Sequence, residues 1–200
     1  IGAFGLWALA MESLAVVLTA VIISLLIGIP IGILMAEINS FAVVIRPILD
    51  GMQTMPSFVY LIPAMMLFGL GKVPAVLATL IYSLPPVIRL TNMGLRQVPK
   101  NIEEAALAYG ATKWQLLKEV RIPLAMPSIL TGVNQTTMMA LAMVVVASMI
   151  GARGLGQEVL LSINRIDIGR GFEAGLSVVV MAIVIDRVTQ SIAKKWEPPR

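Results

Sequence analysis

Long apolar runs separated by short polar segments dominate this chain. A membrane-spanning helix needs about 20 predominantly apolar residues, and five segments are close to that length. They are residues 8–35, 54–70, 73–90, 126–150 and 172–192. The pattern predicts an all-α membrane protein in which residues 1–200 form a single transmembrane domain. Five crossings would put the two ends of the chain on opposite sides of the membrane.

Glycine and proline modify two of these spans. Gly28 and Gly32 lie four residues apart around Pro30 in the first span, a spacing that allows another helix to approach closely while the proline bends the helix. Pro85 and Pro86 are expected to distort the third span near its far end, because neither supplies a backbone donor. Between the first two spans, residues 36–53 carry several charges and predict a linker with a short helix.

Composition supports the membrane assignment and excludes several other classes of protein. The 200 residues are 58% hydrophobic and 13% charged, with a mean hydropathy of +0.91, far from a typical soluble domain. They contain no cysteine and no histidine, so we expect no disulfide, no metal site and no enzymatic activity. The sequence starts at Ile1 without a charged n-region, so no signal peptide is expected and the chain is interpreted as the core of a longer protein.

Lysines and arginines predict the orientation, because they are enriched in cytoplasmic loops. The same rule explains the net charge of +4 without nucleic-acid binding. Four basic residues fall on one side of the predicted spans: Lys72, Arg153, Arg165 and Arg170. Eleven fall on the other: Arg46, Arg89, Arg96, Lys100, Lys113, Lys118, Arg121, Arg187, Lys194, Lys195 and Arg200. The loop at residues 99–123 and the C-terminus are therefore predicted to be cytoplasmic.

The opposite loop, residues 151–171, is predicted to be external. Its glycine-rich start at residues 151–156 is expected to form a flexible turn. An apolar face recurs at Val159, Leu160 and Ile163, which predicts a short helix across the external mouth.

The cytoplasmic loop carries two helix start signals. Asn101 followed by Glu104 has the spacing of a capping box, and Thr112 followed by Gln115 repeats it. Gly110 falls between them and can adopt the left-handed conformation that a helix C-terminus favours. The loop is therefore predicted to form a helix, a glycine corner and a second helix.

The same residues carry a family resemblance. Glu104-Ala105-Ala106, Gly110 and Val120-Arg121-Ile122-Pro123 resemble the E-A-A motif of ABC importer permeases, in which E-A-A, three residues, G and nine residues precede I-x-L-P. The five-span chain likewise resembles the MetI-like core of type I importers. In that family the loop is a coupling helix that sits in a cleft of the cytoplasmic ATPase.

The resemblance implies that seven residues of the loop take part in coupling to the ATPase: Glu104, Ala105, Ala106, Gly110, Thr112, Trp114 and Pro123. Pro123 is also expected to stop the second helix before the fourth span. An amphipathic hairpin lying on lipid headgroups remains an alternative for this loop.

The fourth and fifth spans resemble a narrower group. The run Ile122–Ile150, the segment Gly154-Leu155-Gly156-Gln157 and the segment from Val184 to Gln190 are similar to glycine betaine and proline betaine permeases of the ProU and OpuA type. The resemblance implies osmoprotective uptake of compatible solutes across the bacterial cytoplasmic membrane. It also implies ATPase subunits inside that bind ATP and magnesium, a substrate-binding protein or fused domain outside, and a second permease copy, in contact with membrane lipid. The sequence has no G-x-x-x-x-G-K-[ST] loop, so the chain itself is expected to hold no cofactor.

Polar and apolar residues of the fourth span are candidates for the transport pathway. Asn134, Gln135 and Thr137 either line the pathway or form hydrogen bonds between helices. The apolar run at residues 143–150 either closes the pathway near its external end or packs as an ordinary helix end. Its candidate gate residues are Met143, Val146 and Met149.

The rival class of function is a secondary transporter or channel driven by an ion gradient. Such proteins usually place a carboxylate or another charged group well inside a span. The middle of the predicted spans has none.

Overall fold

The computed structural model describes residues 2 and 5–194, and every regular element in that part of the chain is helical. Four helices there are long and apolar enough to cross a membrane, the third together with the helical segment that precedes it. These are α1 (Trp7–Glu37), α4 (Lys72–Arg96), α7 (Ile122–Met149) and α9 (Ile168–Lys194). Of the basic residues used to predict orientation, Lys195 and Arg200 lie outside the described residues.

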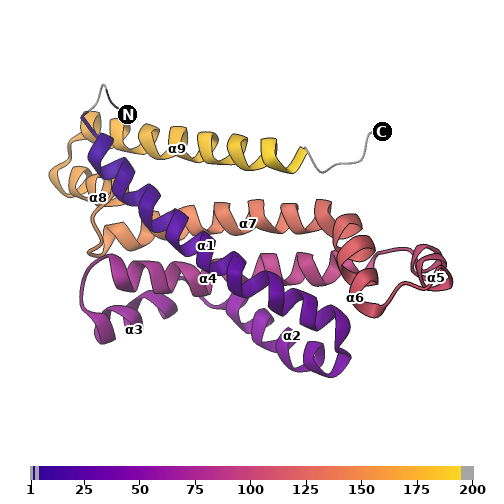
Figure 1. Ribbon diagram of the computed structural model, residues 1–200. Coiled ribbons are helices and arrows are strands. Elements are labelled where there is room, and N and C mark those ends of the chain that lie inside the picture. The colour runs from indigo at the N-terminus through magenta and orange to yellow at the C-terminus, as the bar shows by residue number, and fades with distance from the viewer. Residues whose placement is uncertain (1, 3–4, 195–200) are drawn as a thin grey trace.

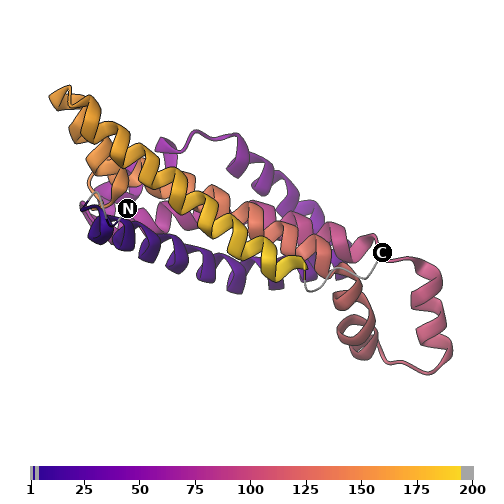
Figure 2. The same cartoon turned by 90° about the horizontal axis from the view of Figure 1, so that it is seen from above.

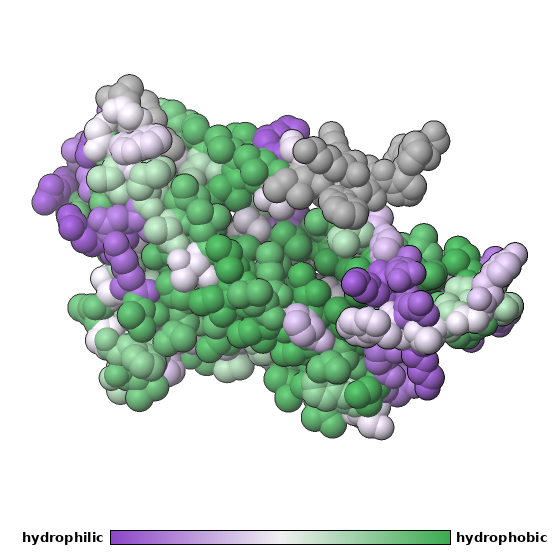
Figure 3. Space-filling view, viewed as in Figure 1, coloured by the Kyte–Doolittle hydropathy of each residue, from purple (hydrophilic) through white to green (hydrophobic). Residues whose placement is uncertain are grey.

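The long helices form a bundle with polar ends. The helix α4 packs against both α1 and α7, and α9 lies along α7 and joins α8 (Leu155–Arg165) at one end (Figures 1 and 2). The start of α1 and the end of α9 lie at opposite ends of the molecule, as predicted. Figure 3 shows an apolar surface over the middle of the bundle and hydrophilic side chains at its two ends. This distribution fits a protein that crosses a bilayer.

The predicted second span, residues 54–70, is wrong as a single crossing. The chain instead forms α2 (Asn39–Thr54) and the 11-residue α3 (Phe58–Phe68), separated by an extended residue at Met55. Pro56 explains the break, since the residue before a proline disfavours the helical conformation. Eleven helical residues extend only about 16 Å, half of what a bilayer core requires. Together, α2 and α3 return the chain to the end where α4 begins (Figure 1).

The helix α4 continues through its two prolines. The predicted third span ended at residue 90, but the helix reaches Arg96, and Pro85 and Pro86 both lie inside it and are buried. The assigned helix is uninterrupted, so the prolines do not end it. Packing between α1 and α7 stabilises α4 here, which compensates for the missing backbone donors.

Close approach at Gly28 and Gly32 is confirmed. A Cβ atom built on Gly32 would lie 2.6 Å from the Cβ of Thr91 and 2.8 Å from the backbone oxygen of Ile88, both in α4. At Gly28 a Cβ would lie 2.5 Å from the side chain of Val87. The two glycines therefore allow α1 and α4 to approach closely. At Gly32, where a backbone atom of α4 is among the close contacts, no larger residue fits without moving one helix.

The short helix expected in the external loop is present as α8, but the segment before it is not a free turn. The backbone N–H of Leu155 donates to Oγ of Ser13 in α1 at 3.0 Å, and both residues are buried. A Cβ on Gly156 would lie 2.2 Å from the backbone oxygen of Val145 in α7. The start of α8 is thus fixed against two long helices. This packing between distant segments, which residues 151–156 alone do not reveal, holds the end of the turn against the bundle.

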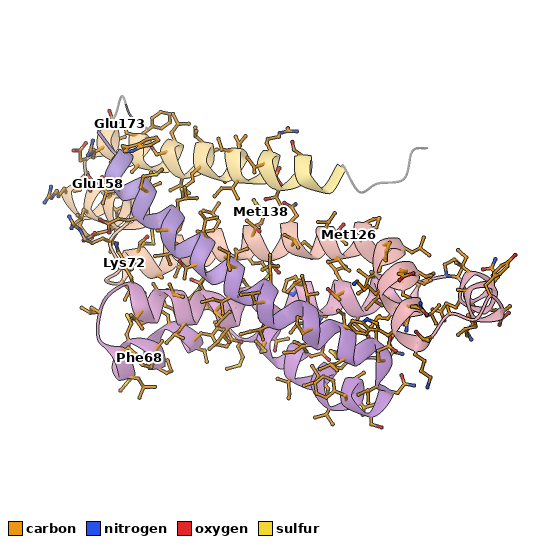
Figure 4. The ribbon with its side chains drawn as sticks, viewed as in Figure 1. Phe68, Lys72, Met126, Met138, Glu158 and Glu173 are labelled. Carbon is orange, nitrogen blue, oxygen red and sulfur yellow. The ribbon has the colours of Figure 1, made fainter. Side chains whose placement is uncertain are left out.

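Ion pairs hold the remaining elements at this end. Lys72 at the start of α4 lies 3.3 Å from Glu12 of α1. Arg170 of α9 contacts Glu158 of α8 at 2.8 Å and Glu173 at 3.3 Å. Figure 4 shows Lys72, Glu158 and Glu173 at the same end of the bundle.

Candidate coupling loop and transport pathway

The segment between α4 and α7 projects beyond the other end of the bundle. It contains α5 (Lys100–Ala108), the single turn α6 (Lys113–Gln115) and the π-helix η2 (Leu116–Arg121). No residue of α5 is buried, and both ribbon views show α5 standing clear of the long helices (Figures 1 and 2). The loop is therefore accessible to a partner.

Gly110 forms the corner between the two parts of the loop, as predicted. Its φ is +86°, in the left-handed region that favours glycine. The N–H of Gly110 donates to the oxygen of Leu107 at 2.9 Å, and the N–H of Ala111 donates to the oxygen of Ala106 at 3.1 Å. This pair of bonds is the Schellman motif, which satisfies the last carbonyl groups of α5.

Of the two predicted capping boxes, the second is confirmed and the first is wrong. Thr112 Oγ1 accepts from the N–H of Gln115 at 3.3 Å, and the N–H of Thr112 donates to Oε1 of Gln115 at 2.9 Å. The helix α5 starts at Lys100, directly after Pro99, so Asn101 lies inside it and caps nothing. Pro99 itself is the N-cap residue, with extended backbone, and its carbonyl oxygen accepts from the N–H groups of Ile102 and Glu103, so the helix starts upstream of the asparagine.

We expect Thr112→Val to loosen the start of α6, because it removes the hydroxyl that accepts from the N–H of Gln115. Loss of an N-cap side chain costs about 1 kcal/mol, or about fivefold in the opening equilibrium. Hydrogen exchange at the Gln115 amide should rise by that factor, whereas Thr112→Ser should retain the slow exchange. Equal protection in Thr112→Val and the unmodified protein would contradict the cap.

The expectation that Pro123 stops the second helix is also wrong. The chain stays helical from Lys113 to Met149, and Pro123 lies in the first turn of α7 directly after η2. A π-turn contains one extra residue, which disrupts the usual backbone pairing, and proline is tolerated in a first helical turn. Figure 2 shows the chain changing direction here, so the segment bends without ending the helix.

The outer surface of the loop combines small and large exposed side chains. Ala106 lines a hollow of about 330 Å³ between α5 and η2, and Glu104 and Ala105 are exposed on α5. Tyr109 is 94% exposed and Trp114 69% exposed. Exposed aromatic side chains next to a small-residue surface are suited to protein binding. The coupling roles of these residues remain predictions.

Sequence reasoning did not assign a role to Arg121, whose side chain connects the loop to the bundle. The guanidinium forms ion pairs with Glu37, the last residue of α1, and with Glu103 of α5. It also donates to the backbone oxygen of Leu95 in α4. An arginine inside the E-A-A motif was the only available signal, and its partners cannot be deduced from spacing.

The structure separates the predicted pathway residues by exposure. Gln135 is exposed, Thr137 is buried and donates to the oxygen of Val133 at 2.8 Å, and Oδ1 of Asn134 is buried without a hydrogen-bond partner among the described residues. Met143 is 1% exposed inside the core between the helices, whereas Val146 and Met149 are partly buried. Their roles in a pathway or gate stay predictions. Figure 4 places Met138, the residue directly after Thr137, midway along α7, and Met126 toward the loop end.

The fold and the projecting loop define a class, the helical permease core of ABC importers. The inward-facing methionine ABC transporter MetNI superposes with a TM-score of 0.84 over 94% of both chains, at 19% sequence identity. At that identity the likeness concerns the fold. The chain belongs to the family described as binding-protein-dependent transport system inner membrane component, whose sequence profile matches residues 28–198. It is therefore a multi-pass permease component of such a system.

Curated relatives share about half of their aligned residues with this chain. The glycine betaine/proline betaine transport system permease protein ProW of Escherichia coli (strain K12) is 52% identical over 194 residues, which cover 97% of this chain and 55% of the relative. The glycine betaine/carnitine transport permease protein GbuB of Listeria monocytogenes serotype 1/2a (strain 10403S) is 49% identical over 189 residues, which cover 94% of this chain and 67% of the relative. The chain thus spans about half to two thirds of these relatives.

Proposed function

We propose that this chain is the transmembrane part of an ATP-driven importer of glycine betaine, proline betaine or related quaternary amines. Two features support the proposal: about 50% identity to permeases with glycine betaine in their names, and the projecting loop with its E-A-A motif. The chain would act without a catalytic site of its own, and partner ATPase subunits would bind ATP and magnesium. The ion-gradient alternative is not favoured, because the family belongs to binding-protein-dependent systems.

The mechanism that we infer is alternating access coupled through the loop. Closure of two ATPase subunits would push the loops of two permease copies together and favour the outward-open form. A partner can shift this equilibrium only by the difference in its contact energy with the two states. The loop and the C-terminus would face the cytoplasm, because the basic residues of the loop gather at that end of the bundle and cytoplasmic loops are enriched in them.

Selectivity for the solute is proposed to reside in an external binding protein or fused domain. A quaternary ammonium group is best bound by several aromatic faces. Tyr60 and Tyr82 instead contact each other edge to face, with ring centroids 6.4 Å apart, and the hydroxyl of Tyr60 donates to the oxygen of Met52. Phe58 and Phe68 are exposed on α3. These four rings are therefore poorly placed to form a cage.

Reconstitution tests the proposal directly. We expect the full-length protein, in proteoliposomes with its ATPase subunits and binding protein, to accumulate radiolabelled glycine betaine only when ATP is enclosed on the ATPase side. Ionophores that collapse proton and sodium gradients should leave the uptake unchanged. Uptake without the ATPase, or loss of uptake with ionophores, would contradict the proposal and favour a gradient-driven transporter.

A further inference from the structure

Arg121 lies where four helical segments meet at the loop end of the bundle. It is the last residue of η2, and its side chain is only 14% exposed. Its Nε lies 3.1 Å from Oε1 of Glu103 in α5, and its Nη2 donates to the oxygen of Leu95 in α4 at 3.4 Å. Its Nη1 donates to Oε1 of Glu37 at the end of α1. A single guanidinium therefore contacts the loop and the ends of two long helices.

The helix α5 has few other attachments. None of its residues is buried, and it packs chiefly against η2. Among the described residues, Glu103 carries the only ion pair of α5, whereas the adjacent Glu104 is exposed and has none. Without Arg121, α5 would be positioned mainly by the Gly110 corner and by its contact with η2.

We propose that Arg121 is a positioning residue that fixes α5 to the ends of α1 and α4, so that a displacement of α5 is passed to α1. The consequence for transport rests on the proposed function, but the fixation itself does not. Arginine suits this role because its planar guanidinium presents five donors in a rigid arrangement, whereas lysine is a compact point charge. The π-helix that ends at Arg121 is a type of segment often found at functional sites.

A distance measured within one chain tests whether Arg121 holds α5 against the end of α1. The 200 residues contain no cysteine, so Leu107→Cys in α5 and Ile38→Cys after α1 give two exposed positions for spin labels. The full-length protein, prepared without other cysteines, is spin-labelled at these two positions and is diluted with unlabelled protein in lipid nanodiscs. Pulsed electron paramagnetic resonance then measures the distance between the labels on α5 and after α1. We expect a narrow distribution that broadens in Arg121→Gln and in Arg121→Lys. An unchanged distribution in Arg121→Gln would overturn the proposal.

Variants of the two glutamates that pair with Arg121 keep the test decisive if Arg121→Gln does not fold. Glu103→Gln and Glu37→Gln each remove one ion pair and should each broaden the distribution. Glu119→Gln is the matched control, because Glu119 is exposed on η2 and has no ion pair among the described residues. It should leave the distribution narrow. Equal broadening by Glu119→Gln would show a general effect of charge and refute the assignment.

The ratio of solute transported to ATP hydrolysed tests transmission separately. Loss of a partly exposed ion pair changes an equilibrium by up to about fivefold, so Glu103→Gln should lower this ratio by up to about that factor while ATP hydrolysis continues. A broadened distance with an unchanged ratio would refute transmission through Arg121. Failure of the proposed function would appear differently, as no ATP-dependent uptake by the unmodified protein.

Discussion

Replacing Gly110 with valine should lower solute uptake by about tenfold while leaving the protein inserted in the membrane. The φ of +86° at this position is one that a β-branched residue rarely adopts. The left-handed conformation costs a residue with a Cβ about 1–2 kcal/mol, which is about tenfold in the equilibrium between corner conformations. Uptake into right-side-out vesicles that enclose ATP, normalised to the amount of inserted protein, measures the effect.

A graded series separates backbone conformation from lost contact at this corner. A Cβ on Gly110 meets no atom within 4 Å inside this chain, so a clash within the chain does not explain a loss of function. Asparagine adopts the left-handed conformation more readily than other residues with a Cβ. Gly110→Asn should therefore retain more uptake than Gly110→Ala, and Gly110→Ala more than Gly110→Val. Normal uptake by Gly110→Val would exclude the corner from coupling.

Replacing Gly32 with leucine should lower the free energy of unfolding by more than the same replacement at an uncrowded glycine of another membrane helix. The added Cβ would lie within 3 Å of Thr91 and of the backbone oxygen of Ile88, so α1 and α4 must separate. Overpacking a close-packed interior costs about 1–3 kcal/mol, and each kcal/mol lowers the unfolding midpoint of a domain of this size by roughly 2–4 °C. Thermal unfolding of the detergent-purified protein should show a midpoint lowered by several degrees.

Gly175 supplies the control for this substitution. It lies in α9, where an added Cβ meets no atom within 4 Å. Gly175→Leu adds the same side chain to a membrane helix and should leave the unfolding midpoint nearly unchanged. If Gly32→Leu and Gly175→Leu unfolded at the same temperature, close packing of α1 against α4 would not limit stability.

Local signals in the sequence predicted local features of the loop. Thr112 and Gln115 form their capping box because both bonds lie within four residues, and Gly110 forms its corner because the conformation is a property of one residue. The apolar runs likewise predicted the long helices. Pro56 was a local signal as well, since it breaks the predicted second span. That the helix after the break, α3, is only 11 residues long, too short to cross a bilayer, was seen only in the structure.

Features that depend on distant segments could not be predicted. Arg121 and Glu37 are 84 residues apart in the chain, and Ser13 and Leu155 are 142 apart. No spacing rule joins such pairs, because the packing of whole helices brings them together. The same applies to the prolines inside α4, whose tolerance depends on neighbouring helices.

The bond between Ser13 and Leu155 has a consequence for where the domain can be cut. The family profile begins at residue 28, yet Ser13, Val16 and Val17 in the first half of α1 are buried in the interior. A fragment trimmed to the residues that the family profile matches would lose these side chains and leave the first amide of α8 without its acceptor in a poorly hydrated site. The first residue of the family profile is therefore a poor place to begin a fragment meant to fold on its own.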